Sequence, residues 1–343
     1  MNYEAEYLPG LERFVRDEVK ALGKRLQDTM DSPREDGLIF RYEGRQTDLL
    51  QLRTPTAVYT LLTFPIPRPK ALLGHQHLTS LLQEIERTRS LHSPERFKTF
   101  TISAAGSNST VFQRIEDELS IATGLAFEPD GGDLFLRVRP SLIDRSGWDV
   151  LVRLSPRPLG TRTWRVCDMP GALNGTIAAS MVALSAPRAR DQVLNIGCGS
   201  GTLLIERLNA APAGRVVGID YDWEALECAR QNIEAARLST PPEVTLMDAT
   251  ALDYPADSFD VILADLPWGA LVGSPEENER LYPALLREAA RVAKPGARFV
   301  AITHAISLLE ALLRSDEHWT IRETLKVFQG GLHPRMYLLE RKP

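Results

Sequence analysis

Apolar and polar positions follow two different periods in the second half of the chain. From residue 192 onward, short apolar runs alternate with longer stretches whose apolar residues recur every three or four positions. This alternation predicts strands and helices of an α/β fold, with a doubly wound parallel sheet. The expected strands are 192–198, 215–220, 243–247, 259–265 and 297–303, and the expected helices are 202–209, 223–237 and 278–293.

The end of the chain predicts a different kind of strand pairing. Two extended stretches, 318–328 and 335–341, are separated by Gly330-Gly331-Leu332-His333-Pro334 with no helix between them. Strands joined by a short turn pair antiparallel. We therefore expect a Rossmann-like, seven-stranded sheet with an antiparallel hairpin at one edge.

The first 65 residues predict a small α+β unit. Apolar residues at helical spacing between Leu11 and Leu22, followed by Gly23, indicate one helix. A short strand is expected at 38–40, and a second helix, interrupted by Pro55, at 48–62. The proline-rich stretch 65–69 is typical of a linker.

Residues 70–160 predict a second α+β unit. Helices are expected around 78–85 and 111–125, and strands at 97–103, 134–138 and 148–154. No cluster of catalytic residue types occurs in this stretch, which favours a binding module. A further helix, with Ile177, Met181 and Leu184 on one face, is expected before the parallel sheet begins.

A glycine-rich loop follows the first strand of the sheet. Gly197, Gly199 and Gly201 lie between that apolar strand and the next expected helix, and Asp220 ends the second strand. Glycines let a ligand approach the backbone closely, and the acid is placed to accept ribose hydroxyls. A dinucleotide site needs a glycine where Thr202 stands. The spacing is typical of an S-adenosylmethionine (SAM) site, although any glycine-rich turn remains an alternative.

A second candidate site follows the fourth strand. This strand ends in Asp265-Leu266-Pro267-Trp268-Gly269. Ligands of open α/β sheets bind beyond the carboxyl ends of such strands. Asp265 and the Leu266 carbonyl are positioned to accept hydrogen bonds from an exocyclic amine, and Trp268 to stack on its base. A strand-ending turn with a buried Trp is the structural alternative.

The third strand ends at Asp248-Ala249, which is suited either to an adenine amino group or to a helix cap. Asp222 is expected to cap the helix at 223–237, and Glu206 to have a structural role. His304, at the end of the fifth strand, is assigned no function. The six histidines form no ligand-like cluster, so no metal site is expected.

Composition narrows these possibilities further. A chain of 343 residues predicts two or three domains, and a net charge of −5 does not itself indicate nucleic-acid binding. Arginines are nevertheless frequent between 137 and 165, where they form either a phosphate-binding patch or a solvated face. Three widely spaced cysteines argue against a disulfide framework and a zinc site and fit a reducing cytosol. Neither a membrane span nor a secretory signal is visible.

Several motifs together resemble THUMP-domain RNA methyltransferases, specifically those that make N2-methylguanosine in tRNA. The resemblance covers nearly the whole chain and is most specific around the fourth strand. The motifs are Tyr7-Leu8-Pro9-Gly10-Leu11-Glu12, Arg162-Thr163-Trp164-Arg165, Leu173-Asn174-Gly175, Asn195 to Glu206, Asp265 to Gly269 with Gly273-Ser274, Asn278 and Leu281 to Glu288, and Gly330-Gly331-Leu332.

This resemblance implies a domain organisation. It consists of an N-terminal ferredoxin-like domain at 1–65, a THUMP RNA-binding domain at 66–160, a linker at 161–180 and a class I methyltransferase domain at 181–343. Two departures from the family pattern stand out. Asn195-Ile196 replaces the usual Asp-Pro, and Ala104-Ala105 replaces basic residues.

The resemblance also implies a cytoplasmic enzyme that uses SAM. The enzyme methylates a guanosine in the tRNA acceptor stem, at position 6 or its neighbour, while the THUMP domain holds the single-stranded 3′ end. The base is flipped into a pocket formed by Asp265, Leu266, Pro267 and Trp268. A small activator subunit accompanies some relatives, and the sequence leaves this open.

The implied cofactor-binding residues are Asn174, Asn195, Gly197, Cys198, Gly199, Gly201, Asp220, Tyr221, Asp248, Ala249 and Asp265. The expected RNA-binding residues are Arg137, Arg139, Arg153, Arg157, Arg162 and Arg165. Two other functions remain as hypotheses. One is methylation of another exocyclic amine, in ribosomal RNA guanine or DNA adenine. The other is a non-catalytic RNA-binding protein, which the Asn195 departure suggests.

Overall fold

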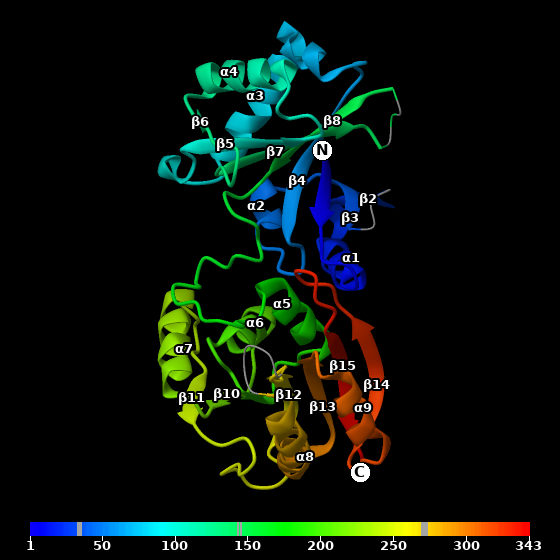
Figure 1. Ribbon diagram of the computed structural model, residues 1–343, viewed down its shortest axis with the longest axis vertical. Coiled ribbons are helices and arrows are strands. Elements are labelled where there is room, and N and C mark those ends of the chain that lie inside the picture. Colours follow the sequence, from blue (N-terminus) through cyan, green and yellow to red (C-terminus); the bar gives the residue numbers. More distant parts are fainter. Residues whose placement is uncertain (33–35, 143, 145, 269–273) are drawn as a thin grey trace. The chain divides into compact units, whose positions relative to one another are not determined.

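The computed structural model describes residues 1–32, 36–142, 144, 146–268 and 274–343 in two compact units (Figure 1). The first unit contains residues 1–7 and 15–160, and the second contains residues 8–14 and 161–343. The division after residue 160 lies where the linker is expected. The short segment 8–14, however, leaves its sequence neighbours and packs with the second unit.

The first unit is built on one eight-stranded sheet, in the order β2-β3-β1-β4-β8-β7-β5-β6. The expected ferredoxin-like and THUMP domains share this sheet, because β4 pairs with β1 on one side and with β8 on the other. The strands are β1 (Asn2–Glu6), β2 (Leu26–Asp31), β3 (Gly37–Tyr42), β4 (Ala57–Phe64), β5 (Thr99–Ala104), β6 (Ala126–Phe127), β7 (Leu134–Pro140) and β8 (Trp148–Arg153).

The helices of this unit contribute one side of its core. Leu81 and Ile85 of α3 and Ile115 and Leu119 of α4 are buried against the sheet, as their spacing predicts. The helices are α1 (Glu12–Lys20), α2 (Gln46–Leu49), α3 (His75–Arg89) and α4 (Thr110–Thr123), with short 3-10 turns η1 (Gly23–Arg25), η2 (Pro69–Leu73) and η3 (Pro94–Arg96).

The helix expected at 48–62 is wrong. The chain forms only the single turn α2 there and then enters strand β4. Pro55 prevents the helix from continuing, and Val58, Thr60 and Thr63 are β-branched residues that favour a strand. All residues from 57 to 61 are buried. A fully buried strand lacks the alternation that would distinguish it from a buried helix.

The second unit confirms the expected Rossmann-like sheet. Its order is β11-β10-β9-β12-β13-β15-β14; the first five strands run parallel, and β15 is antiparallel to both β13 and β14. The strands are β9 (Gln192–Ile196), β10 (Arg215–Asp220), β11 (Glu243–Leu246), β12 (Phe259–Asp265), β13 (Ala293–Thr303), β14 (Trp319–Lys326) and β15 (Arg335–Arg341).

Helices cover both faces of this sheet (Figure 1). Residues of α5, α6 and α7 pack in one core with Val193 and Val261, whereas residues of α8 and α9 pack in another with Leu194 and Ile262. Successive strand residues thus enter opposite cores, which explains the continuous apolar runs. The helices are α5 (Gly175–Leu184), α6 (Thr202–Ala210), α7 (Trp223–Ala236), α8 (Pro275–Val292) and α9 (Ile306–Arg314), of which α9 was not expected.

Candidate active site

The glycine loop between β9 and α6 has a backbone that only glycine adopts easily. Gly197, Gly199 and Gly201 have φ angles of 61°, 50° and 82°. A Cβ atom at Gly197 or Gly199 would meet no protein atom within 4 Å, so open space lies beside the loop there. Cys198, which is buried, anchors the loop by donating its N–H to the Ile219 carbonyl over 2.9 Å. The loop can therefore admit a ligand against its backbone.

Asp220 ties the end of β10 to this loop. One carboxylate oxygen accepts the Gly199 N–H at 2.8 Å, and the other accepts the Asp222 N–H at 3.0 Å. Burial raises the pKa of Asp220. A carboxylate has further lone pairs, so these bonds leave acceptor capacity for ribose hydroxyls. Asp222 caps α7 through the Glu224 N–H, as predicted.

Asn195 contains an unsatisfied oxygen beneath the loop. The side chain is fully buried, and its Nδ2 donates to the Leu263 carbonyl over 3.1 Å. Its Oδ1 has no hydrogen-bond partner among the described residues. Buried polar atoms normally have partners. A ligand with a donor group, such as the ammonium of an amino acid moiety, would satisfy this oxygen.

Tyr221 directly follows Asp220 at the end of β10, and Asp248 follows the adjacent strand β11. Asp248 accepts hydrogen bonds from the Thr250 N–H and hydroxyl at 2.8 and 2.7 Å, and these bonds lower its pKa. Tyr221 is 76% exposed. Ala249 is partly buried and packs on the core of α8 and α9. Met247, which directly precedes Asp248, donates its N–H to the Asp220 carbonyl. Asp248 therefore lies near Asp220.

Asp265 ends β12, which pairs with β9 and therefore lies next to the glycine loop's strand. Burial raises the pKa of Asp265 to about 7, although the indole N–H of Trp268 donates to its Oδ1 at 3.2 Å and lowers it. The carboxyl group can therefore exchange a proton near neutral pH. Gly269 and Gly273 of the same motif lie outside the described residues.

The backbone after Asp265 is held from both sides. Leu266, which is buried, donates its N–H to the Ile302 carbonyl at 3.0 Å. The Pro267 carbonyl accepts hydrogen bonds from Asn278 Nδ2 at 2.9 Å and from the Tyr282 hydroxyl at 2.7 Å. The Pro267 oxygen is thus used within the protein, and the Leu266 carbonyl is the one that we expect to accept from a substrate.

Tyr282 is a supporting residue for which no function was expected. Its hydroxyl also contacts the Thr303 hydroxyl at 2.7 Å, and Thr303 lies at the end of the neighbouring strand β13. Asn278 and Tyr282 are four residues apart and therefore share one face of α8. This spacing is the signal that could have identified them.

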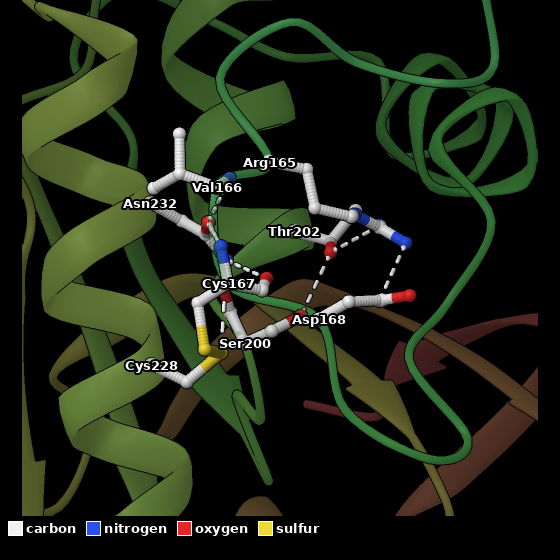
Figure 2. The surroundings of a disulfide bond; sticks show 8 residues. All are labelled: Arg165, Val166, Cys167, Asp168, Ser200, Thr202, Cys228 and Asn232. Carbon is white, nitrogen blue, oxygen red and sulfur yellow. Dashed lines mark hydrogen bonds and ion pairs between the residues drawn. A yellow bond between two sulfur atoms is a disulfide. The ribbon is translucent and has the colours of Figure 1, made fainter.

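The segment that connects the two units, residues 161–174, packs on α6 and α7 (Figure 2). Asn232 of α7 accepts the N–H groups of Val166 and Cys167 and donates to the Cys167 and Ser200 carbonyls, all at 2.9–3.0 Å. Ser200 belongs to the glycine loop. This connecting segment is therefore fixed directly against the loop.

A disulfide bond joins Cys167 of the connecting segment to Cys228 of α7 (Figure 2). The expectation of no disulfide is therefore wrong. The two cysteines are 61 positions apart in the sequence, and the fold brings their Cα atoms to 5.4 Å. Sequence spacing alone carries no information about such a long-range pair. Cys198 is free and buried.

The structure places most of the expected RNA-binding arginines in internal contacts. Arg137 pairs with Glu6, and Arg139 with Glu4 and Asp149. Arg153 is buried and donates to the carbonyls of Ser155 and Pro156. These three guanidinium groups act within the protein, which does not support the predicted phosphate contacts. Arg137 and Arg139 alternate with apolar residues along β7, a pattern that predicts exposed side chains. In the structure they instead face carboxylates of β1 and β8.

Arg162 and Arg165 also have internal partners, in the second unit. Arg162 is buried, with an ion pair to Glu206 at 2.8 Å and a hydrogen bond to the Gly175 carbonyl. Arg165 donates to the Leu173 carbonyl and the Thr202 hydroxyl (Figure 2). Only Arg157 of the six expected arginines is largely exposed, with 62% of its side chain accessible.

Asn174 caps α5: its Oδ1 accepts the Thr176 N–H at 2.8 Å. Asn174, which was predicted to bind the cofactor, therefore also has a structural role as a helix cap.

Within the described ranges, none of the helices is both long and apolar enough to pass through a lipid bilayer. The same residues include no group of three or more His, Cys, Asp or Glu side chains placed to hold a metal ion.

The chain is similar to a methyltransferase family, to named tRNA methyltransferases and to a solved structure of TrmN. Residues 162–335 match the family described as UPF0020, RMKL-like, methyltransferase domain. The tRNA (guanine(6)-N2)-methyltransferase of Methanocaldococcus jannaschii is 24% identical and aligns over 99% of this chain and 100% of its own length. The tRNA (guanine(6)-N(2))-methyltransferase THUMP3 of Bos taurus is 32% identical over 187 residues, which are 51% of this chain and 37% of the cattle protein. The crystal structure of TrmN from Thermus thermophilus superposes with a TM-score of 0.74 at 25% identity and covers 99% of both chains.

Proposed function

Because the chain belongs to the UPF0020 family, the RMKL-like methyltransferase domain, we propose that it methylates the exocyclic N2 of a guanosine in tRNA, with SAM as the methyl donor. The observation that carries this proposal is the arrangement at the end of β12. A carboxyl group with a pKa of about 7, a backbone carbonyl and an indole ring lie beside the glycine-loop strand. The names of the archaeal and cattle relatives support the choice of guanine N2.

The residues around the glycine loop fit SAM. Asn195 Oδ1 is a buried acceptor without a partner among the described residues, and Gly197 and Gly199 leave open space beside the backbone. Asp220 would hold the ribose hydroxyls, and Asp248 the adenine amino group. When bound, SAM supplies a methyl group already activated for transfer to a nitrogen nucleophile.

The residues at the end of β12 would act on the guanine. The N2 amine of a paired guanine points into the minor groove, so the base must leave the helix stack to be methylated. Asp265 and the Leu266 carbonyl would each accept one N–H of the amine, and Trp268 would stack on the base. Asp265 would accept the proton that N2 loses, since its pKa near 7 suits proton transfer at neutral pH.

The substrate proposal extends to the acceptor stem. We place the target at position 6 or its neighbour, following the guanine(6) relatives. The THUMP part at 66–160, which follows the ferredoxin-like part at 1–65, would hold the single-stranded 3′ end. We further propose a cytoplasmic location. Cytosolic disulfides are rare, so the Cys167–Cys228 pair would there depend on the redox conditions.

A direct assay tests this function. The full-length protein is incubated with labelled SAM and unmodified tRNA transcripts, and the products are analysed by nucleoside mass spectrometry. We expect N2-methylguanosine among the nucleosides of the treated tRNA. Methylation of ribosomal RNA guanine or DNA adenine in place of tRNA would contradict the substrate, and SAM binding without methylation of any nucleic acid would contradict the assigned reaction.

A further inference from the structure

The indole ring of Trp268 is held at two points. Its Nε1–H donates to Asp265 Oδ1 at 3.2 Å, and the ring lies against the imidazole of His304, with 5.6 Å between ring centroids and 35° between planes. His304 directly follows β13, whose residue Ile302 pairs with Asp265 on β12. The two neighbouring strand ends therefore present the tryptophan and the histidine to each other.

His304 is in turn held by the turn between β14 and β15. The backbone N–H of His333 donates to His304 Nε2 at 3.4 Å. The turn itself is closed by a bridge between Gln329 and Leu332, and the His333 ring packs edge-on against Phe328 at 4.6 Å. The turn therefore offers His304 a fixed donor.

These contacts form a chain from Asp265 through Trp268 and His304 to His333. His304 is exposed and belongs to neither core of the second unit. Exposed side chains outside the core contribute little to folding stability. The His304 contacts therefore need an explanation other than core packing.

We propose that His304 is a positioning residue for the target guanine and acts through Trp268. This inference rests on the proposed function. A single hydrogen bond to Asp265 would let the indole rotate about its N–H, whereas the imidazole beside it, tilted by 35°, restricts that rotation. In this proposal the guanine stacks on the indole face turned away from His304, with its amine directed at Asp265 and the Leu266 carbonyl. Misplacement of a reacting group by about 1 Å costs roughly a hundredfold in rate.

The kinetic test uses substitutions at His304 in the full-length protein. We expect His304→Ala to lower kcat by about tenfold or more, which is about 1.4 kcal/mol of transition-state stabilisation. The KM for tRNA and the Kd for SAM should stay within about twofold of the wild-type values. His304→Phe retains a ring against Trp268 and should restore most of the rate. His318→Ala is the matched control, because His318 is also exposed in the second unit but lies in the turn before β14.

A double-mutant cycle separates positioning from a direct role. If His304 acts through Trp268, His304→Ala should have almost no further effect on kcat in the Trp268→Ala background. Additive losses in the two variants would overturn the inference, as would a His304→Ala enzyme with wild-type kcat.

Fluorescence tests the same contact without any methylation. Subtracting the emission of Trp268→Phe from that of the wild type isolates Trp268, and the same subtraction in the His304→Ala background shows its state without the imidazole. A red-shifted Trp268 emission in His304→Ala supports the positioning role, and an unchanged emission overturns it even if the wild type makes N2-methylguanosine. If the wild type methylates no tRNA while His304→Ala still shows the red shift, the proposed function is overturned and the His304–Trp268 contact is established.

Discussion

Asp265 gives the sharpest prediction at the scale of single residues. Burial holds its pKa at about 7, and it must be ionised to accept a proton from the amine. The methylation rate should therefore rise with pH up to about 7 and level off above it. Asp265→Asn should lower kcat by about 10²–10⁴ and abolish this dependence, with SAM binding unchanged in calorimetry. Asp253→Asn, an exposed loop carboxylate, should behave as the wild type; a full rate in Asp265→Asn would exclude a proton-acceptor role.

Part of this site could be predicted from the sequence and part could not. Asp220 and Asp265 were identifiable because each ends an apolar strand, and parallel strands end at the same edge of a sheet. The contacts of Thr303 and His304 depend on how β13 packs beside β12, which no local pattern encodes, whereas the helical spacing of Asn278 and Tyr282 was a usable signal. The internal partners of the arginines were also hidden: their density suggested a phosphate site, but Glu4 and Glu6, which pair with Arg139 and Arg137, lie far away in the sequence.

At the scale of elements, the disulfide should stabilise the connecting segment on α7. A disulfide restricts the unfolded chain, and for a sequence separation of 61 the lost chain entropy corresponds to about 4 kcal/mol. Cys228→Ser should lower the melting temperature and weaken SAM binding, because the connecting segment contacts the glycine loop through Asn232 and Ser200. Thermal unfolding with and without reductant measures the effect. Reductant should shift the wild type and leave the double variant Cys167→Ser/Cys228→Ser unchanged; equal shifts in both would contradict a stabilising disulfide.

The turn before α1 should be sensitive to substitution of Gly10. Gly10 has a φ of 94°, and a Cβ there would lie 1.9 Å from the Lys326 carbonyl oxygen. Gly10→Ala therefore adds a backbone clash to the left-handed strain. Gly23→Ala is a matched control, because Gly23 has a φ of 73° but open space around a Cβ. We expect Gly23→Ala to cost about 1–2 kcal/mol of unfolding free energy and Gly10→Ala clearly more, measured by denaturant unfolding. Equal costs would show that the turn relaxes away from β14.

Element types followed the sequence closely wherever one period was dominant. All seven strands of the second sheet were expected within a few residues, because turn residues separate them from amphipathic helices. β4 was mistaken for a helix because both its faces are buried, and burial removes the alternation by which strands are distinguished.

At the scale of the whole molecule, Arg157 is the one of the six expected arginines whose loss should weaken the proposed tRNA binding. Arg157 has an exposed guanidinium, whereas the buried guanidinium of Arg153 satisfies backbone carbonyls. Arg157→Ala should weaken tRNA binding and reduce the salt dependence of log K by about one phosphate contact, without loss of stability. Arg153→Ala should mainly lower the melting temperature. Filter binding at several salt concentrations measures the tRNA affinity of Arg157→Ala, and Arg322→Ala on the edge strand β14 is the control. Unchanged affinity in Arg157→Ala would exclude this arginine as a phosphate contact.

The division into two units places Leu11 in the core of the methyltransferase unit, although it lies far from the rest of that unit in sequence. Leu11 is fully buried there, and Leu49 is fully buried in the core of the first unit. Each Leu→Ala change should cost about 2–5 kcal/mol, but in different units. SAM stabilises only the unit that binds it. Leu11→Ala should therefore lower the melting transition that SAM raises, and Leu49→Ala should lower the transition that SAM leaves unchanged. Calorimetric scans with and without SAM measure both, and a Leu11→Ala variant that shifts only the SAM-insensitive transition would assign residues 8–14 to the first unit.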